Sequence, residues 1–396
     1  MWDVVQELYF VLVEPILLYF GLASLGFGDP TYGRENLPYS PQERAAVYEN
    51  PEVKVTRRRV YLHQGKPVLD VSIPDNVRVL PCVLSGKRVT AWINYYIWEM
   101  PNAPGRDKVN ADVYLVHGIN DYSGKVSPQG VGFMLSGFRV IALDMPSFGR
   151  SSGLHSYLYT MRWNVDALDA VMYHVRTFDE AENLPNLATR KRFAQGSSMG
   201  GFTVLYHCAL HPPVATKAQG GPETHDRLAL DGIAVSAPML RIAPESRPNM
   251  FVEMVGRLIS LVAGRLPLAR AIKGNVSDDP KVEFYARQDP QVYHGLVRVD
   301  TGLAIIAGID HLNEIVSRIR CPVAIHHGSH DRVTSPEGSR VFFDKLDVQP
   351  KKLRIWPGIE HAMLKSTPEM SVKDLERRNA LVEDMASWFI DLTQHA

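Results

Sequence analysis

Cysteine is scarce in this chain of 396 residues, and its three cysteines are far apart in the sequence. Cys82, Cys208 and Cys321 are odd in number and form no C-x-x-C pair, so they predict neither a disulfide framework nor a cysteine zinc site. Three free or buried thiols are the ordinary interpretation, and they suit a reducing compartment. We therefore expect a cytoplasmic protein.

An excess of charge of one sign is also missing. The 43 Lys and Arg residues balance 43 Asp and Glu residues, so there is no broad attraction to polyanions. We therefore expect no nucleic acid partner. The hydrophobic fraction of 45% is ordinary for a folded protein and predicts a sizeable core. The length fits two or three domains, or one large α/β domain with an insertion.

Residues 1–27 form an unusually apolar segment whose only charged side chains are acidic, at Asp3, Glu7 and Glu14. A secretory signal begins with basic residues, and a spanning helix is disfavoured by Glu14 and Pro15 near its centre. On a helical wheel the three acids lie within about 40° of one another. We predict a helix on one side of a membrane, with the acidic stripe in water. Packing on the protein's own fold or on a partner stays open, and a cleaved signal is less favoured.

Beyond this segment, the sequence alternates short apolar strands with helices. Residues 28–88 are an N-terminal extension, whose first half is rich in Pro, Gly and charge and predicts an irregular connection. From residue 89 the alternation predicts a mostly parallel sheet with helices on both faces, built from residues 89–238 and 320–396. Residues 239–319 interrupt it with a helical pattern and predict a cap over the carboxyl ends of the strands.

The sequence Gly196-Ser197-Ser198-Met199-Gly200 matches G-x-S-x-G. It follows an apolar strand and opens a helix, which is the context that this nucleophile turn requires. The central Ser198 lies in a strained turn, and Gly196 and Gly200 avoid collisions with neighbouring backbone. We therefore predict that Ser198 is a nucleophile.

A serine hydroxyl needs a histidine to take its proton and an acid to orient that histidine. In a fold of this kind the acid and then the histidine follow the serine in the chain. Asp331 and His361 each follow a predicted strand at the same sheet edge as Ser198, so we assign them these roles. Their neighbours His330 and Glu360 are the nearest competitors, and we expect little from either.

Acyl transfer also needs hydrogen-bond donors for the oxyanion. The amide after the nucleophile, that of Met199, is one candidate. The amide of Ile119 is the other, because it follows an apolar strand that ends at His117-Gly118. His117 itself is expected to tie this loop together through hydrogen bonds.

These pieces, in this order, resemble the α/β-hydrolase fold and, within it, the monoacylglycerol lipase-like group with a serine aminopeptidase S33-type domain. The resemblance covers residues 89–388 and rests on LVHGINDYSG, ALDMPSFGRSSG, GSSMGG, DPQVYHGLVRVDTGLAI, HGSHDRVTSPEGS and GIEHAML. It implies the triad Ser198, Asp331 and His361, an oxyanion hole from Ile119 and Met199, and a cap that forms an apolar acyl tunnel. Ser147 and Phe148 depart from the usual Gly and His of this family, and the long extension has no counterpart.

The sequence thus predicts a serine carboxylester hydrolase for an apolar, lipid-like ester, working through an acyl-enzyme and implying no metal or organic cofactor. An acyltransferase with the same residues stays open. An aminopeptidase would need clustered acids to bind an amine, and a non-catalytic scaffold would be expected to lack a triad member. The oligomeric state is not predicted.

The acids available for an amine are Glu245, Glu253, Asp278 and Asp279. The apolar cap residues favouring an acyl group are Met250, Phe251, Met254, Val255, Leu258, Ile259, Leu261, Val262 and Leu266.

Overall fold

The computed structural model describes residues 2–63, 66–67, 91–106, 108–212, 228–242, 247–269 and 276–394. Within these ranges, nine strands form one sheet in the order β11-β10-β7-β6-β4-β5-β3-β1-β2. The strands from β11 to β5 pair in parallel, whereas β3, β1 and β2 add antiparallel pairs at one edge. Their bounds are β1 Lys54–His63, β2 Lys66–Pro67, β3 Trp92–Glu99, β4 Ala111–Val116, β5 Arg139–Leu143, β6 Lys191–Ser197, β7 Gly232–Ser236, β10 Val323–Gly328 and β11 Lys351–Trp356.

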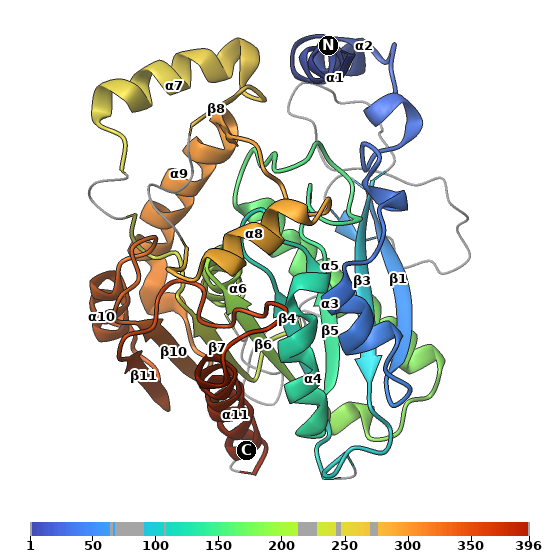
Figure 1. Cartoon of the computed structure of the whole chain (residues 1–396), viewed down its shortest axis with the longest axis vertical. Coiled ribbons are helices and arrows are strands. Elements are labelled where there is room, and N and C mark those ends of the chain that lie inside the picture. Colours follow the sequence, from blue (N-terminus) through green and yellow to red (C-terminus); the bar gives the residue numbers. More distant parts are fainter. Residues whose placement is uncertain are drawn as a thin grey trace, which may run out of the picture.

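Helices cover both faces of this sheet, as the sequence predicts (Figure 1). One face packs against α5 (Arg162–Ala181), α6 (Met199–Leu210) and α10 (Pro336–Lys345). The other packs against α4 (Ser127–Leu135) and α11 (Val372–Gln394). All described residues of β4, β5 and β7 are buried, which is why these strands read as continuous apolar runs.

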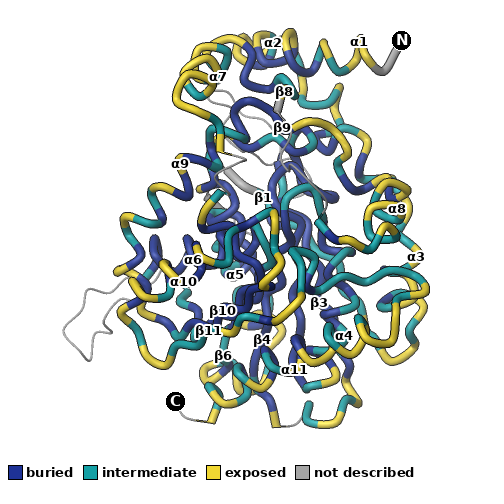
Figure 2. The backbone as a smooth tube through the Cα atoms, turned by 60° about the vertical axis from the view of Figure 1, so that its left-hand side comes forward, coloured by how far each residue is buried: buried dark blue, intermediate teal, exposed yellow. Residues whose placement is uncertain are grey.

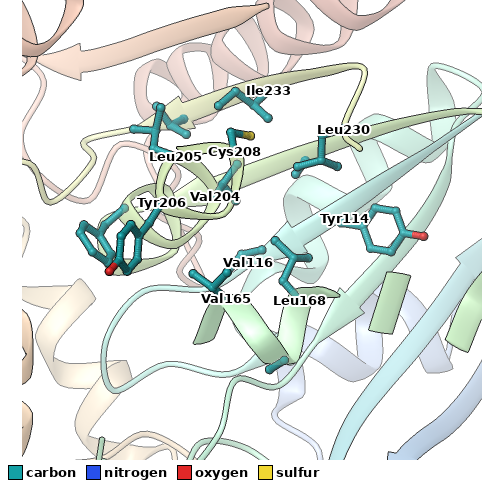
Figure 3. Packing of buried hydrophobic residues seen from close by; sticks show 14 of the residues in the cluster. Tyr114, Val116, Val165, Leu168, Val204, Leu205, Tyr206, Cys208, Leu230 and Ile233 are labelled. Atoms are coloured by element: carbon teal, nitrogen blue, oxygen red, sulfur yellow. The ribbon is translucent and has the colours of Figure 1, made fainter. Parts of the chain in front are cut away.

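The larger of two hydrophobic clusters joins α5 and α6 to the sheet. Val165 and Leu168 of α5, together with Val204 of α6, contribute to the same packed cluster as Val116 of β4 (Figure 3). Cys208 of α6 is also part of it, and its Sγ lies 3.3 Å from that of Cys321. Both of these thiols are free and buried, as expected, whereas Cys82 lies outside the described residues.

The chain between β7 and β10 contains α7 (Met250–Ala263), β8 (Pro267–Ala269), α8 (Pro280–Gln288), β9 (Val297–Arg298), α9 (Val299–Ile315) and the 3₁₀ turn η8 (Val316–Arg318). β8 and β9 form a separate two-stranded sheet. Helix α9 packs against both α6 and α7 and so anchors this segment to the core. The boundaries 239–319 for a distinct cap remain a prediction.

The N-terminal helix is shorter than the predicted 1–27. It consists of α1 (Trp2–Leu8), a π-helical turn η1 (Tyr9–Val13) and α2 (Glu14–Phe20), and Gly21 ends it at a φ of 69°. The 3₁₀ turn η2 (Leu25–Gly28) lies at the end of the predicted helix. Short helices follow in the segment predicted to be irregular: η3 Arg34–Asn36, α3 Pro41–Glu43 and η4 Arg44–Tyr48. Two other short 3₁₀ turns are η5 Ser123–Val126 and η6 Leu187–Thr189.

The predicted orientation of the acidic stripe is wrong. Glu14 is fully buried, and its carboxylate accepts hydrogen bonds from Arg265, from the hydroxyl of Tyr32 and from the amide of Gly26. Glu7 pairs with Arg298 at 2.8 Å. These partners exist because two arginines of the segment between β7 and β10 lie under the helix, so its acids face the protein. The side chain of Asp3 lies outside the described residues.

Phe10, Val11 and Leu18 of the N-terminal helix are buried, but most of its other apolar side chains face outward, as do most of those of α7. Both helices lie at the same end of the molecule, and α7 contacts η1 (Figures 1 and 2). In the described part of the chain, no helix combines the length and apolarity needed to cross a bilayer. The exposed apolar side chains are Val4, Val5, Leu8, Leu12, Val13, Ile16, Tyr19 and Phe20 of the N-terminal helix, and Met250, Phe251, Val252, Met254, Val255, Leu258, Leu261 and Val262 of α7.

Candidate active site

Ser198 lies in the turn between β6 and α6, with φ 54° and ψ −116°. This backbone conformation is rare for a residue with a side chain and stores strain at the turn. Two glycines make the turn possible. A Cβ on Gly200 would collide with the carbonyl oxygen of Val116, and one on Gly196 would collide with the backbone of Gly200.

The structure brings Ser198, His361 and Asp331 together. Nε2 of His361 lies 3.0 Å from Oγ of Ser198, and its Nδ1 lies 2.8 Å from Oδ2 of Asp331. Ser198 begins α6, while Asp331 and His361 lie in the loops after β10 and β11. Because these strands are parallel, their carboxyl ends meet at one sheet edge, as the sequence predicts.

Donors other than His361 also hold the carboxylate of Asp331. Its Oδ1 accepts from the amides of Val333 and Thr334, and its Oδ2 accepts from the hydroxyl of Thr334. Nε2 of His327 lies 3.1 Å from the same Oδ2. Burial raises the pKa of Asp331, but the hydrogen bonds from His327 and His361 outweigh it and hold that pKa well below its usual range.

The two competing residues point elsewhere. Nδ1 of His330 lies 2.9 Å from the hydroxyl of Ser329, in an exposed loop. Glu360 accepts hydrogen bonds from the hydroxyl of Ser277 and the amide of Asp278. It therefore connects the loop after β11 to the segment between β7 and β10, which is a structural contact rather than part of the Ser198 cluster.

The loop after β4 borders Ser198. A Cβ added to Gly118 would lie 3.5 Å from the Cβ of Ser198, so Ile119 follows directly beside the Ser198 turn. His117 is buried, and its ring bridges the carbonyl of Gly118 and the amide of Met145. It ties this loop together as expected. That the amides of Ile119 and Met199 bind an oxyanion remains a prediction.

The two residues that depart from the family pattern, Ser147 and Phe148, lie close to the loop after β4. Ser147 takes a φ of 72°, a left-handed conformation that suits the glycine usual at this position. Its hydroxyl donates to the carbonyl of Tyr157. Phe148 is buried, and its ring contacts that of His117 edge to face, with centroids 5.5 Å apart. Phe148 therefore supports the loop that carries Ile119.

Ser198 and His361 open into a cavity of about 980 Å³. This volume suits a ligand of lipid or drug size. The predicted apolar residues of α7 and Leu266 do not line it, because α7 lies at the outer surface. Its apolar lining comes instead from Ile119, Met239, Ile242, Val276, Val282, Val292, Val297, Ile305, Ile306, Val333, Met363 and Leu364.

Sequence reasoning missed three polar groups around this cavity. His327 and Thr334 hold Asp331, and Asp121 lines the cavity near Gly118. Burial raises the pKa of Asp121 to about 6, against opposing attraction from Lys125. Thr334 follows Asp331 by three residues, but only the fold shows that its hydroxyl returns to the carboxylate. Among the described residues, the one cluster suited to a metal ion, Asp169, His207 and His211, lies elsewhere.

The fold and the arrangement of Ser198, His361 and Asp331 are those of an α/β hydrolase. The chain matches the profile of the serine aminopeptidase S33 family over residues 107–368 and belongs to that family. It is 27% identical to caffeoylshikimate esterase of Arabidopsis thaliana, over 71% of this chain and 78% of that protein. It is 24% identical to monoacylglycerol lipase of Mycolicibacterium smegmatis, over 75% of this chain and 92% of that protein.

Solved structures show the same fold. The monoacylglycerol lipase of Paleococcus ferrophilus superimposes with a TM-score of 0.54 at 24% identity, covering 70% of this chain and 94% of that chain. A soluble variant of monoglyceride lipase from Saccharomyces cerevisiae, in complex with a substrate analogue, gives 0.58 at 18% identity, covering 76% and 92%. The protein is therefore an α/β-hydrolase enzyme, similar to monoacylglycerol lipases and esterases.

Proposed function

We propose that the protein is a serine carboxylester hydrolase that cleaves lipid-like esters with an apolar acyl group. The observation that carries this proposal is the hydrogen-bonded chain from Ser198 through His361 to Asp331, open to a large cavity with a mostly apolar lining. The names of the relatives, an esterase and monoacylglycerol lipases, agree with it.

In this mechanism, Oγ of Ser198 attacks the ester carbonyl while Nε2 of His361 takes its proton. Asp331 orients the imidazole and stabilises its charged form. The amides of Ile119 and Met199 stabilise the tetrahedral oxyanion, and the loss of one such donor typically costs roughly 10²–10³ in turnover. The alcohol leaves with the proton from His361, and a water molecule, activated by the same histidine, then releases the acid and frees Ser198.

The aminopeptidase alternative has little support from the acids that the sequence offered for it. Glu253 pairs with Arg257, Asp278 pairs with Arg332, and Asp279 caps the first turn of α8. None of these three carboxylates lines the cavity. Glu245 lies outside the described residues. An acyltransferase uses the same chemistry but gives the acyl group to an alcohol or thiol instead of water.

The test is labelling with a fluorophosphonate probe, followed by turnover of esters graded by acyl length and of aminoacyl amides. The proposal expects labelling at Ser198, its loss in Ser198→Ala, and a preference for long acyl esters. Faster cleavage of amides with a free amine would instead establish the aminopeptidase. Acyl transfer that outpaces hydrolysis when alcohols compete would establish the acyltransferase.

We further propose that the outward apolar residues of the N-terminal helix and α7 rest on a lipid bilayer surface. Folded proteins seldom expose apolar patches larger than a few hundred Å² unless the patch binds something. Glu7 and Glu14 are paired inward with Arg298 and Arg265, so their charges do not oppose insertion of the opposite side of the helix. An apolar ester also partitions into the same surface. The protein would then be a peripheral membrane enzyme of the cytoplasm.

Deleting the N-terminal helix would expose the buried Arg265, so surface substitutions are the better test of this proposal. Leu8→Ser with Ile16→Ser, and Leu258→Ser with Val262→Ser, should each reduce flotation with phosphatidylcholine vesicles. Leu135→Ser removes an equally exposed leucine at the end of α4 and should leave flotation unchanged. Equal flotation of all four proteins would exclude this surface, and loss of activity on soluble esters would point to misfolding instead.

A further inference from the structure

Three potential metal ligands meet between two core helices, away from the proposed active site. Asp169 lies on α5, His207 lies in the last turn of α6, and His211 directly follows that helix. The two histidines are four residues apart, so they project from the same side of the helix. Asp169 faces them from the neighbouring helix, which packs against α6.

The polar atoms of this cluster lack hydrogen-bond partners, although they are buried. His207 is 1% exposed and His211 is 8% exposed. Oδ1 of Asp169, both ring nitrogens of His207 and Nδ1 of His211 have no hydrogen bond. Buried polar groups are almost always satisfied, and four unpartnered atoms gathered in one cluster call for a missing partner such as an ion. A single ion would satisfy three of the four atoms.

The spacing suits an ion better than direct hydrogen bonds. Oδ1 of Asp169 lies 3.5 Å from Nε2 of His207 and 3.4 Å from Nδ1 of His211, which is longer than an ordinary hydrogen bond. Zinc bonds of 2.0–2.2 Å in a tetrahedron place neighbouring ligand atoms about 3.4 Å apart. All three ligand atoms lie within 4.8 Å of one another, which groups them around one common point.

We propose that Asp169, His207 and His211 bind one divalent transition metal ion of the zinc type. Two imidazole nitrogens and one carboxylate oxygen suit such an ion, whereas calcium and magnesium prefer oxygen ligands alone. The Asp169 side chain is 21% exposed, so its side of the site can admit a water molecule as the fourth ligand.

The ion would act as a clamp rather than as a catalyst. His207 follows Ser198 by nine residues, and at 1.5 Å per residue this separates them by about 13 Å along α6. The site therefore lies at the far end of the helix that Ser198 begins. A metal bridge from α5 to that end would fix the helix on the sheet, so it should change stability and leave the chemistry at Ser198 largely unchanged. This inference does not depend on the proposed ester hydrolysis.

The test measures metal binding by the full chain after treatment with a chelator and removal of the chelator. Calorimetric titration should show one Zn²⁺ ion per chain. Co²⁺ should give the visible absorption of a low-symmetry, four-coordinate site. At a zinc concentration 100 times the Kd, the Tm should rise by about 3 °C. The readout is binding and stability, so it is independent of any esterase measurement.

Three variants assign the ligands. Asp169→Asn and His211→Gln should each weaken zinc binding at least tenfold and remove the Tm shift, because a metal ligand is lost. Asp166→Asn removes an acid one turn away on the same helix and should bind zinc like the wild type. His361→Ala should also retain binding, which excludes capture of zinc by the proposed triad.

Two results would overturn the proposal. One is the absence of saturable Zn²⁺ and Co²⁺ binding by the folded wild-type chain, which needs no variant to interpret. The other is binding of equal affinity in wild type, Asp169→Asn and His211→Gln, which would place the ion elsewhere. Circular dichroism of each variant identifies any that fails to fold, and His211→Gln at the helix end is the substitution least disturbing to the core.

Discussion

His327 Nε2 lies 3.1 Å from Oδ2 of Asp331, the same oxygen that lies 2.8 Å from Nδ1 of His361. The other ring nitrogen of His327 lies 2.7 Å from the hydroxyl of Ser339, so this buried histidine is held at both ends. The carboxylate oxygen that meets His361 is therefore also held by a second, buried histidine. Such support fixes the direction in which Asp331 presents its charge to the proposed catalytic histidine.

The first prediction concerns the histidine and the acid of the proposed triad. His361→Ala and Asp331→Asn should each lower kcat for ester hydrolysis by about 10³ or more, with little change in substrate binding. His330→Ala and Glu360→Gln should have much smaller effects, because neither side chain contacts the Ser198 cluster. Steady-state kinetics on one short and one long acyl ester measure all four. If Glu360→Gln were as damaging as Asp331→Asn, the acid would have to be reassigned.

The second prediction concerns the hydroxyl of Thr334, which lies 2.9 Å from Oδ2 of Asp331. Thr334→Val keeps the shape and removes this donor, so it should lower kcat about tenfold while the KM changes little. Thr334→Ser restores the hydroxyl and should recover most of the activity. A uniform loss in both variants would indicate a packing role instead, and the protein's Tm provides the independent check.

That Ser198, Asp331 and His361 lie together could be predicted, because their placement depends on local order along the chain. The strand, the G-x-S-x-G turn and the helix around Ser198 are consecutive, and Asp331 and His361 each follow a strand at its carboxyl end. In a parallel sheet, these ends meet whatever the details of packing. The hydrogen bonds of His327 and Thr334 depend on how one loop folds back, and no residue pattern records that.

The N-terminal helix shows the opposite case. Its acidic stripe was visible in the sequence, but the arginines that it meets are 251 and 291 residues away along the chain, at Arg265 and Arg298. Periodicity identifies the sides of a helix without identifying which side faces the protein. The acidic side chains here pair with buried cations, so much of the apolar surface of the helix faces outward. The lining of the cavity was mispredicted for the same reason, because the apolar α7 faces away from it.

The third prediction follows from Glu43, a fully buried residue whose two carboxyl oxygens have no hydrogen-bond partner. Burial raises its pKa to about 8, despite opposing attraction from Arg150. The folded state therefore favours the protonated form. In the unfolded chain this carboxyl group releases its proton near its ordinary pKa of about 4.5, whereas the folded protein holds the proton up to about pH 8. The stability of the fold therefore falls as the pH rises between these two values.

Glu43→Gln keeps the shape and removes this titration. The free energy of unfolding of the variant minus that of the wild type should be about 3 kcal/mol larger at pH 8 than at pH 5. Urea unfolding of both proteins at these two pH values measures the difference. Glu49→Gln, at an exposed position six residues later, serves as the control and should show almost no pH-dependent gain. A constant offset between wild type and Glu43→Gln would contradict the prediction.

The last prediction concerns what holds the N-terminal helix in place. Glu14 and Arg265 form a buried ion pair at 2.8 Å, and Arg265 also donates to the carbonyl of Phe10. Arg265→Met removes the cation and leaves a buried carboxylate without its charge partner, which typically costs about 3–5 kcal/mol. Limited proteolysis should then cleave residues 1–28 faster than in the wild type, while the core stays intact.

Two further variants separate charge from packing. Glu14→Leu combined with Arg265→Met replaces the pair with apolar side chains and should recover much of the lost protection, because neither charge is then left buried alone. Arg257→Met breaks an exposed pair with Glu253 on α7 and should cost less than about 1 kcal/mol, with no change in proteolysis. If the double variant were cleaved as fast as Arg265→Met, the arginine would hold the helix through its bond to Phe10 and its packing rather than through its charge.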